Sequence, residues 1–276
     1  MTQRDRAALL RRLHDLRPLV LPNAWDAASA RVVERAGARA VATTSAGVSW
    51  SCGRRDGGRL SRDEAAAAVR RIVSAVGVPV TADVEGGYGA GTAGDVADTV
   101  RAVVAAGAAG VNLEDAPGRG GGALLAPEEH AERVRAARQA AFNAGGDLVI
   151  NARTDVYLAA GAAPETRFEE AVRRANRYLA AGADCVFVPG VQDTETIGAL
   201  VRAVDGPVNV MVGPGAPGVA DLGRLGVARV SVGPAIALAA LAAADRAARE
   251  LVEAGTYRAL ETGLSFGEAD GLFADA

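Results

Sequence analysis

The sequence predicts an α/β fold: a single (β/α)8 TIM-type barrel over residues 1–276, with an N-terminal helix and an extended C-terminal helical segment. Eight short, Val-rich apolar runs alternate with longer Ala-, Arg- and Glu-rich segments of helical spacing. A weak repeat also joins a helix end, a Gly and a strand. Runs that are apolar on both faces are typical of parallel strands covered by helices. The alternative is an open doubly wound sheet, although no GxGxxG follows the first run.

The elements follow one another in a regular order. An amphipathic helix is expected near Thr2–Asp15, and a long Ala/Leu/Arg helix from Ala235 to about Ala254. The predicted strands are Pro18–Leu21, Ala40–Thr44, Val78–Asp83, Gly110–Glu114, Leu148–Arg153, Cys185–Val188, Val208–Val212 and Arg229–Val232. Helices predicted between them include Glu64–Ala75, Asp95–Ala106, Glu128–Ala141, Phe168–Ala181 and Thr194–Val204.

The composition excludes several kinds of chemistry. All 30 basic residues are Arg, so mechanisms that need a lysine amine, such as Schiff-base aldolases and P-loop nucleotide binding, are excluded. Two His and two Cys speak against His-rich metal sites and Ser-His-Asp catalysis. A net charge of −3 gives no support to nucleic-acid binding. The charged N-terminus and the lack of an 18-residue apolar run predict a cytoplasmic protein without a membrane segment.

Carboxylates collect where two neighbouring strands end. In parallel barrels the functional residues lie at the carboxyl ends of the strands. Asp83 and Glu85 are two residues apart, so on an extended strand both would point to one face, and Glu114 ends the next strand. Three converging carboxylates need a cation, and oxygen ligands suit Mg²⁺, or Mn²⁺ as the alternative. The structural alternative is that one or more of these acids caps a helix or pairs with an Arg.

Other polar residues are expected around these acids. Arg153 suits a bidentate grip on a substrate carboxylate or phosphonate, the alternative being an ion pair with Asp155 or Glu114. Tyr88 is a candidate substrate contact, and Asp56 lies on a Gly-rich loop. The hydroxyls and backbone N–H groups of a run of small residues can seat a second carboxylate, although such runs also make ordinary turns. That run is Thr43, Thr44, Ser45, Ala46 and Gly47.

Four remaining residues are given structural roles. Cys185 falls inside a predicted strand and is expected in the core, whereas Cys52 lies on the loop that carries Asp56. His14 and His130 fall on highly charged helices and are expected at the surface.

The stretches LPNAWDAASARVVERAGARAVATTSAGVS, TADVEGGYG, GVNLEDA and INARTDVYL resemble the isocitrate lyase / phosphoenolpyruvate mutase superfamily, in order and spacing, over roughly residues 18–233. The resemblance is closest to the shorter, mutase-like members. It implies that Asp83 is the direct Mg²⁺ ligand, with Glu85 and Glu114 acting through water and Asp56 assisting. It further implies that the backbone around Thr44, Ser45 and Ala46 holds the carboxylate of a 2-oxo acid, and Arg153 its other anionic end. Packing of residues 235–276 on a neighbouring subunit, in a dimer or tetramer, is also implied.

The chain departs from the family pattern at two places. The family usually has Asp-x-Asp where this chain has Asp83-Val84-Glu85. The loop after the fourth strand carries a Lys-(Lys/Arg)-Cys-Gly-His motif in the lyases, and a Lys and an Asn in the mutases. Residues 115–125 here contain no Cys, Lys, His or Asn. Arg119 can bring charge to a closed site, but it cannot donate a proton at neutral pH.

The resulting hypothesis is a Mg²⁺-dependent lyase or hydrolase. It would cleave a C–C bond of a small 2-oxo or 2-hydroxy dicarboxylate through a metal-stabilised enolate. The alternatives are a phosphonopyruvate-type enzyme, mutase or hydrolase, acting on a P–C bond, and a non-catalytic 2-oxo acid binder.

Overall fold

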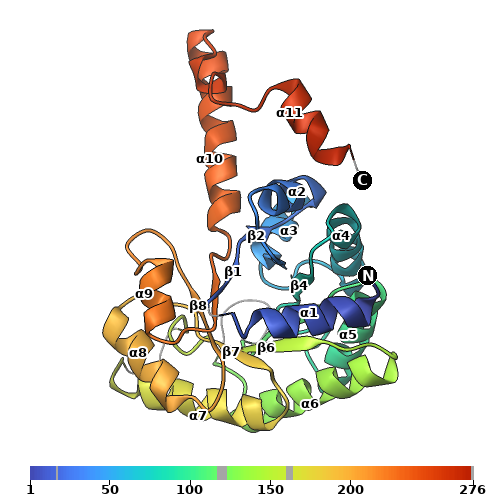
Figure 1. Ribbon diagram of the computed structural model, residues 1–276, viewed down its shortest axis with the longest axis vertical. Coiled ribbons are helices and arrows are strands. Elements are labelled where there is room, and N and C mark those ends of the chain that lie inside the picture. The colour runs from blue at the N-terminus through green and yellow to red at the C-terminus, as the bar shows by residue number, and fades with distance from the viewer. Residues whose placement is uncertain (17, 117–122, 160–163, 275–276) are drawn as a thin grey trace.

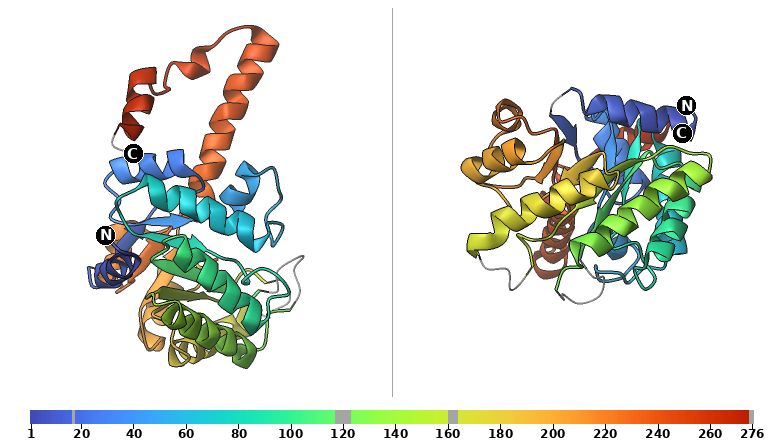
Figure 2. Two further views of the ribbon diagram at one scale, coloured as in Figure 1. Left: turned by 90° about the vertical axis from the view of Figure 1, so that its right-hand side faces the viewer. Right: turned by 90° about the horizontal axis from the view of Figure 1, so that it is seen from below.

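The strands form one closed parallel barrel. The computed structural model describes residues 1–16, 18–116, 123–159 and 164–274. Over these residues the sheet order is β1-β9-β8-β7-β6-β5-β4-β3-β2, and helices surround it (Figures 1 and 2). The strands are β1 Leu19–Leu21, β2 Asn23–Ala24, β3 Val41–Thr43, β4 Val80–Asp83, β5 Gly110–Glu114, β6 Val149–Arg153, β7 Cys185–Phe187, β8 Val208–Met211 and β9 Arg229–Ser231. The predicted barrel is confirmed, and the open doubly wound sheet is wrong because β2 to β9 are neighbours in chain order and β1 pairs with β9.

The ring closes at Pro22. On its N-terminal side β1 pairs with β9, and on its C-terminal side β2 pairs with β3. Proline has no N–H to donate, but its carbonyl accepts a hydrogen bond from the Ala42 N–H at 3.3 Å. The first predicted strand is therefore followed, beyond this proline, by a second short strand. The first pairs with β9 and the second with β3.

The helices lie close to their predicted bounds. Side chains cap several of them: the Ser61 hydroxyl accepts from the Glu64 N–H at 3.2 Å, and the Glu64 carboxylate accepts from the Ser61 N–H at 2.8 Å. The main helices are α1 Gln3–Leu13, α2 Ala27–Arg35, α3 Ser45–Ser51, α4 Arg62–Ala75, α5 Ala93–Ala105, α6 Pro127–Asn143, α7 Arg167–Ala180, α8 Thr194–Ala203, α9 Val219–Arg224, α10 Ala235–Arg249 and α11 Phe266–Asp270. Short turns complete the chain at η1 Pro164–Thr166, η2 Glu250–Ala254, η3 Arg258–Leu260 and η4 Gly271–Phe273.

Polar side chains meet inside the barrel. Asn151 Nδ2 donates to Asn112 Oδ1 at 2.8 Å and to Asn209 Oδ1 at 2.9 Å. Arg229 Nη2 donates to Asn112 Oδ1 at 3.2 Å. These residues come from β5, β6, β8 and β9, and non-adjacent strands can touch in this way only across the interior. The layer beneath the carboxyl ends of the strands is therefore polar.

Both histidines are buried, so the surface placement predicted for them is wrong. His14 is 8% exposed and His130 is 0% exposed. Charged neighbours in the sequence, such as Arg12 beside His14 and Glu129 and Glu132 beside His130, are exposed, whereas the histidines are not. Cys185 is buried, as predicted, and Cys52 is exposed.

The C-terminal segment stands away from the barrel. Figures 1 and 2 show α10 projecting outward and α11 turning back toward α2. Arg31 Nε of α2 donates to the Leu272 carbonyl of η4. Within the described residues, no helix is both long and apolar enough to cross a membrane.

Candidate active site

The first acid of the site ends β4. Its backbone N–H donates to Thr43 Oγ1 at 2.8 Å, and Asp83 Oδ2 accepts from the Ser45 N–H at 3.1 Å. The end of β3 and the start of α3 therefore orient this carboxylate. Asp83 lies at the carboxyl end of its strand, where the sequence predicts it.

Glu85 reaches the site by a route that the sequence argument did not predict. Strand β4 ends at Asp83, and Glu85 has a left-handed φ of +50°. The extended-strand argument that placed both acids on one face is therefore wrong. The turn nevertheless brings them together, because the Glu85 N–H donates to Asp83 Oδ1 at 3.4 Å. Glu85 Oε2 accepts from the Gly58 N–H, while Oε1 is buried and has no partner among the described residues.

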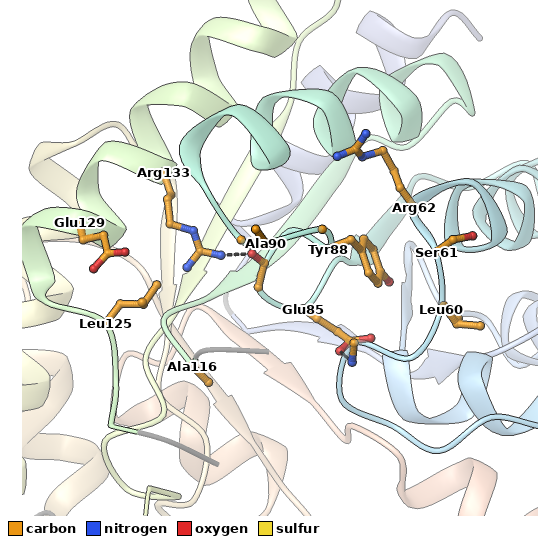
Figure 3. Close-up of a pocket in the computed structure, with 14 residues that line it drawn as sticks. Leu60, Ser61, Arg62, Glu85, Tyr88, Ala90, Ala116, Leu125, Glu129 and Arg133 are labelled. Carbon is orange, nitrogen blue, oxygen red and sulfur yellow. Dashed lines mark hydrogen bonds between the residues drawn. The ribbon is translucent and has the colours of Figure 1, made fainter. Parts of the chain in front are cut away.

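Arg133 supports this turn from α6. It is 2% exposed, and its Nη2 donates to the Gly86 carbonyl while Nη1 donates to the Glu114 carbonyl at 3.3 Å. Figure 3 shows its guanidinium reaching across to the turn that carries Glu85 and Tyr88. Tyr88 also has a left-handed φ, +58°. Two non-glycine residues in this conformation so close together indicate backbone strain that the surrounding contacts must offset.

Glu114 and Arg153 form an ion pair at the ends of β5 and β6. Arg153 Nη1 lies 3.0 Å from Glu114 Oε2. Its Nε and Nη2 donate to the two oxygens of Asp155 at 2.6 and 2.9 Å. The ion-pair alternative is thus what the structure shows, with both proposed partners. The hydrogen bonds to Asp155 use two of the five guanidinium N–H donors, and Nη1 faces Glu114 as an ion-pair partner.

The run from Thr44 to Gly47 forms the start of α3. The Thr44 N–H donates to the Ala24 carbonyl at 3.1 Å, and the Ser45 N–H is held by Asp83. Two of the amides expected to receive a substrate carboxylate therefore have partners within the protein. The next two residues, Ala46 and Gly47, are buried in the first turn, and the side chain of the N-cap residue Thr44 makes no capping hydrogen bond. A Cβ on Gly47 would lie 2.8 Å from the Trp25 Cβ, so close packing accounts for this glycine.

A cavity of about 390 Å³ opens beside Glu85, and its lining does not include Asp83, Glu114 or Arg153. Glu85 and Tyr88 line it together with Arg62 of α4 and Arg133 of α6 (Figure 3). Tyr88 is 8% exposed, and its burial, together with the nearby Glu85 charge, raises its pKa well above the ordinary value. Its position fits the predicted substrate contact.

Burial and nearby carboxylates raise the pKa values of three acids, Glu85, Glu114 and Asp56. Burial, with the Asp83 charge second, raises the pKa of Glu85 to about 7. Burial also raises the pKa of Glu114 to about 8, although Arg153 opposes the shift. Asp56 is exposed as a residue, but partial burial of its carboxyl raises its pKa, and Asp83 raises it further. Carboxylates that repel one another in this way favour a bound cation.

The donor set fits a hard metal ion. It consists of oxygens alone, and Glu85 Oε1 is a buried acceptor in need of a partner. Among the described residues, however, no group of three or more His, Cys, Asp or Glu side chains is arranged to hold an ion by itself. This arrangement suits an ion that keeps several waters, with few direct protein ligands.

The structure adds contacts around the site that the sequence argument did not place. Arg119 lies outside the described residues. The contact of the Asp155 carboxylate with Arg153 was considered only as an alternative, and the contact of Arg133 with the turn at Gly86 was not predicted. Arg133 sits in an ordinary charged helix, and only the docking of α6 brings it to the turn at Gly86.

Comparisons with known proteins agree on one family. The family model described as phosphoenolpyruvate phosphomutase matches residues 10–252. An uncharacterised protein of Mycobacterium tuberculosis is 39% identical over 241 residues, which is 86% of this chain and 87% of that protein. The 2,3-dimethylmalate lyase of Eubacterium barkeri is 35% identical over 208 residues, 72% of this chain and 68% of the lyase.

Solved structures have the same fold. A putative lyase/mutase from Burkholderia cenocepacia J2315 superposes with a TM-score of 0.90 at 39% identity, covering 99% of this chain and 97% of that one. An oxaloacetate acetylhydrolase in complex with its product oxalate gives a TM-score of 0.85 at 25% identity, covering 96% and 93%.

Proposed function

Because the chain belongs to the phosphoenolpyruvate phosphomutase family, within the isocitrate lyase / PEP mutase superfamily, we propose that it is a Mg²⁺-dependent enzyme that breaks a C–C bond of a small 2-oxo or 2-hydroxy dicarboxylate. Superfamily members are lyases and mutases that act on small carboxylates or phosphonates. The observation that carries the proposal is the meeting of Asp83, Glu85 and the Glu114–Arg153 pair at the carboxyl ends of three neighbouring strands.

The acids would hold the metal. Asp83 is the proposed direct ligand of Mg²⁺, with Glu85 and Glu114 acting through water and Asp56 assisting; Mn²⁺ is the alternative ion. When bound, the ion would stabilise negative charge that develops on the oxygen at C2 of the substrate. Glu85 is one methylene longer than the Asp of the family pattern, and it would meet the metal from the left-handed turn that carries it.

Arginine and small residues would hold the substrate. A dicarboxylate has two anionic ends, and the Arg153 N–H donors that Asp155 does not use suit one of them. The first turn of α3, at Ala46 and Gly47, is proposed for the other end, and Tyr88 would contact the substrate from the cavity side. Two relatives are named for dicarboxylates, 2,3-dimethylmalate lyase and oxaloacetate acetylhydrolase, and they support this substrate class.

In the proposed lysis the substrate releases one proton and takes up another. In lysis of a 2-hydroxy diacid the hydroxyl at C2 loses its proton and becomes a carbonyl. The bond to C3 breaks, and its electron pair stays on C3, which then takes up a proton. The proposed contribution of Arg153 is to fix the carboxylate next to the breaking bond, which lowers the entropic cost of reaching the reactive geometry.

The alternative enzyme class acts on a P–C bond. It is supported by the description of the matching family and by a phosphomutase among the structural neighbours, that of Streptomyces platensis subsp. rosaceus. A phosphonate would meet the same Arg153, so the substrate panel must separate the two classes.

The test is a substrate panel with matched variants. Oxaloacetate, 2-methylisocitrate, 2,3-dimethylmalate and phosphonopyruvate are assayed with purified protein and Mg²⁺, before and after treatment with EDTA. We expect turnover of a dicarboxylate that EDTA abolishes and that Asp83→Ala lowers by at least about 100-fold, on the scale of lost charge stabilisation. Asp221→Ala, an exposed acid on α9, is the control and should leave turnover unchanged.

Three outcomes would count against the proposal. Turnover that survives Asp83→Ala would contradict the metal role of that acid. Turnover of phosphonopyruvate alone would favour P–C chemistry. Saturable binding by calorimetry without turnover of any of the four compounds would favour a non-catalytic binder.

A further inference from the structure

A buried carboxylate lies directly beside the proposed active site. Asp115 follows Glu114 at the end of β5 and is 0% exposed. Its Oδ2 accepts from the Tyr178 hydroxyl at 2.7 Å and from Arg174 Nη1 at 2.9 Å, both on α7. Its Oδ1 accepts from the Asp155 N–H at 3.0 Å. Both oxygens therefore have donors within the protein, which argues against a role as a metal ligand.

This carboxylate is connected to the arginine of the site. Asp115 holds the backbone of Asp155, and the Asp155 side chain makes two hydrogen bonds to Arg153. The Asp115 N–H also donates to the Arg153 carbonyl at 3.1 Å. The orientation of the guanidinium thus depends, through Asp155, on a carboxylate that α7 holds in place.

Asp115 also fixes one edge of the cavity, directly through its backbone carbonyl and indirectly through Arg174. The Leu125 N–H donates to the Asp115 carbonyl at 2.9 Å, and the Leu125 carbonyl accepts from Arg174 Nη1 at 2.8 Å. Leu125 and Ala116 both line the cavity beside Glu85 (Figure 3). Arg174 therefore links the Asp115 carboxylate to the Leu125 carbonyl.

The contacts are strong and are screened from water. Charge-assisted hydrogen bonds are roughly twice as strong as neutral ones, and a buried network with every member satisfied is rigid. Arg174 is 7% exposed, and the Tyr178 ring packs edge-on against His130 with centroids 4.5 Å apart. This packing holds the phenol aligned with the carboxylate.

We propose that Asp115 is a positioning residue: through it, Tyr178 and Arg174 of α7 orient Arg153 toward the anionic end of the substrate and hold Leu125 at the cavity edge. The inference rests on the proposed role of Arg153 in substrate binding. It assigns different roles to two adjacent acids: Glu114 at the proposed metal site, and Asp115 in positioning Arg153.

The test uses two variants and a spectroscopic readout. The Arg153 Nε–H signal is assigned in a ¹H–¹⁵N spectrum by its loss in Arg153→Lys. In the wild-type protein this proton is bonded to Asp155 and should exchange slowly with water. In Asp115→Asn one amide N–H must face a donor whichever way the amide is turned, so we expect the Nε–H exchange to accelerate by about tenfold or more, the equivalent of one lost hydrogen bond. Tyr178→Phe, which keeps the ring against His130, should give a smaller acceleration.

Kinetics provide the second readout. For a dicarboxylate that the wild-type protein turns over, Asp115→Asn should raise KM by about tenfold with a smaller change in kcat, because misorienting Arg153 weakens binding of the anionic end. Arg173→Gln is the control: this neighbour on α7 is bonded to Glu170 and should change neither readout.

The outcomes separate the two proposals. If no compound is turned over, the proposed function fails, whereas the exchange measurement still tests the positioning role. If Asp115→Asn does not fold, Tyr178→Phe decides. A folded variant with unchanged Arg153 Nε–H exchange, or with unchanged KM on an active substrate, overturns the inference.

Discussion

At the scale of single residues, burial changes the chemistry of several charged groups. Burial raises the pKa values of Glu85 and Glu114 to about 7 and 8. Arg153 lies between Glu114 and Asp155. Sequence alone identified these residue types at the ends of strands, because the apolar runs end there. It could not show that Arg153 pairs with both Glu114 and Asp155, since the contact with Glu114 depends on how β5 and β6 align.

His14 provides a test of burial outside the site. Its Nδ1 lies 2.9 Å from the Leu10 carbonyl, which can only accept, so this nitrogen carries the proton of the neutral ring. Burial, with the Arg229 charge second, lowers its pKa to about 4. The unfolded chain binds a proton near pH 6.5, whereas the folded chain does not until about pH 4. Stability is therefore lost as the pH falls through this window, and His14 causes no further loss below it.

The expected size follows from this shift. Between pH 7 and pH 5, the wild-type protein should lose about 2 kcal/mol more unfolding free energy than His14→Gln, which does not titrate. Urea unfolding of both proteins at the two pH values measures the difference. An equal loss in the two proteins would show that His14 is protonated in the folded state at pH 5.

At the scale of elements, the turn between β4 and α5 decides the geometry of the acids. Gly87 in this turn has a φ of +93°, and an added Cβ would lie 2.5 Å from the Val96 Cγ2. Gly57 has a similar φ of +87°, but nothing lies within 4 Å of the added atom. The two glycines therefore separate backbone strain from packing.

We predict that Gly87→Ala destabilises the protein more than Gly57→Ala. The control should cost about 1 kcal/mol for the left-handed backbone, and Gly87→Ala roughly 2–4 kcal/mol because overpacking is added. Unfolding free energies in urea measure both. Equal costs would mean that α5 moves away freely and that the turn is not held by its packing on Val96.

The secondary structure itself could largely be predicted from the sequence. The bounds of α8 and β5 agree with the prediction within one residue, because an apolar periodicity and a capping residue are local signals. The relation between Asp83 and Glu85 was predicted for a wrong reason. Strand periodicity does not apply beyond Asp83, and the left-handed turn is stabilised by Arg133, which lies 48 residues farther along the chain than Glu85.

At the scale of the whole molecule, most of the C-terminal arm is exposed, and its end contacts α2. We define this arm as residues 235–274, from α10 to η4. Only Ala237 of α10 is buried, whereas Leu238 and Leu241 are 50% and 53% exposed and Phe266 is 85% exposed. Exposed apolar surface of this extent is typical of interfaces. We propose that the arm packs on a second subunit.

The oligomer can be tested by light scattering after gel filtration. The wild-type protein should have a mass at least twice the 27.9 kDa of one chain. The double variant Leu238→Glu, Leu241→Glu should shift it toward the monomer, because two charges would be buried in an apolar contact. Phe142→Glu, on an exposed residue of α6, is the control. A wild-type monomer would contradict the proposal.

The sequence by itself determined the barrel and the rim on which its acids lie. Alternating apolar runs and helices specify parallel strands, and parallel strands bring their carboxyl ends to one side. Only the tertiary structure decided the closure at Pro22, the polar barrel interior, the burial of both histidines and the grip of Asp115 and Asp155 on Arg153. The physical reason is that these contacts join residues far apart in the chain, and their partners are selected by how helices dock on strands, which leaves no periodic signal in the sequence.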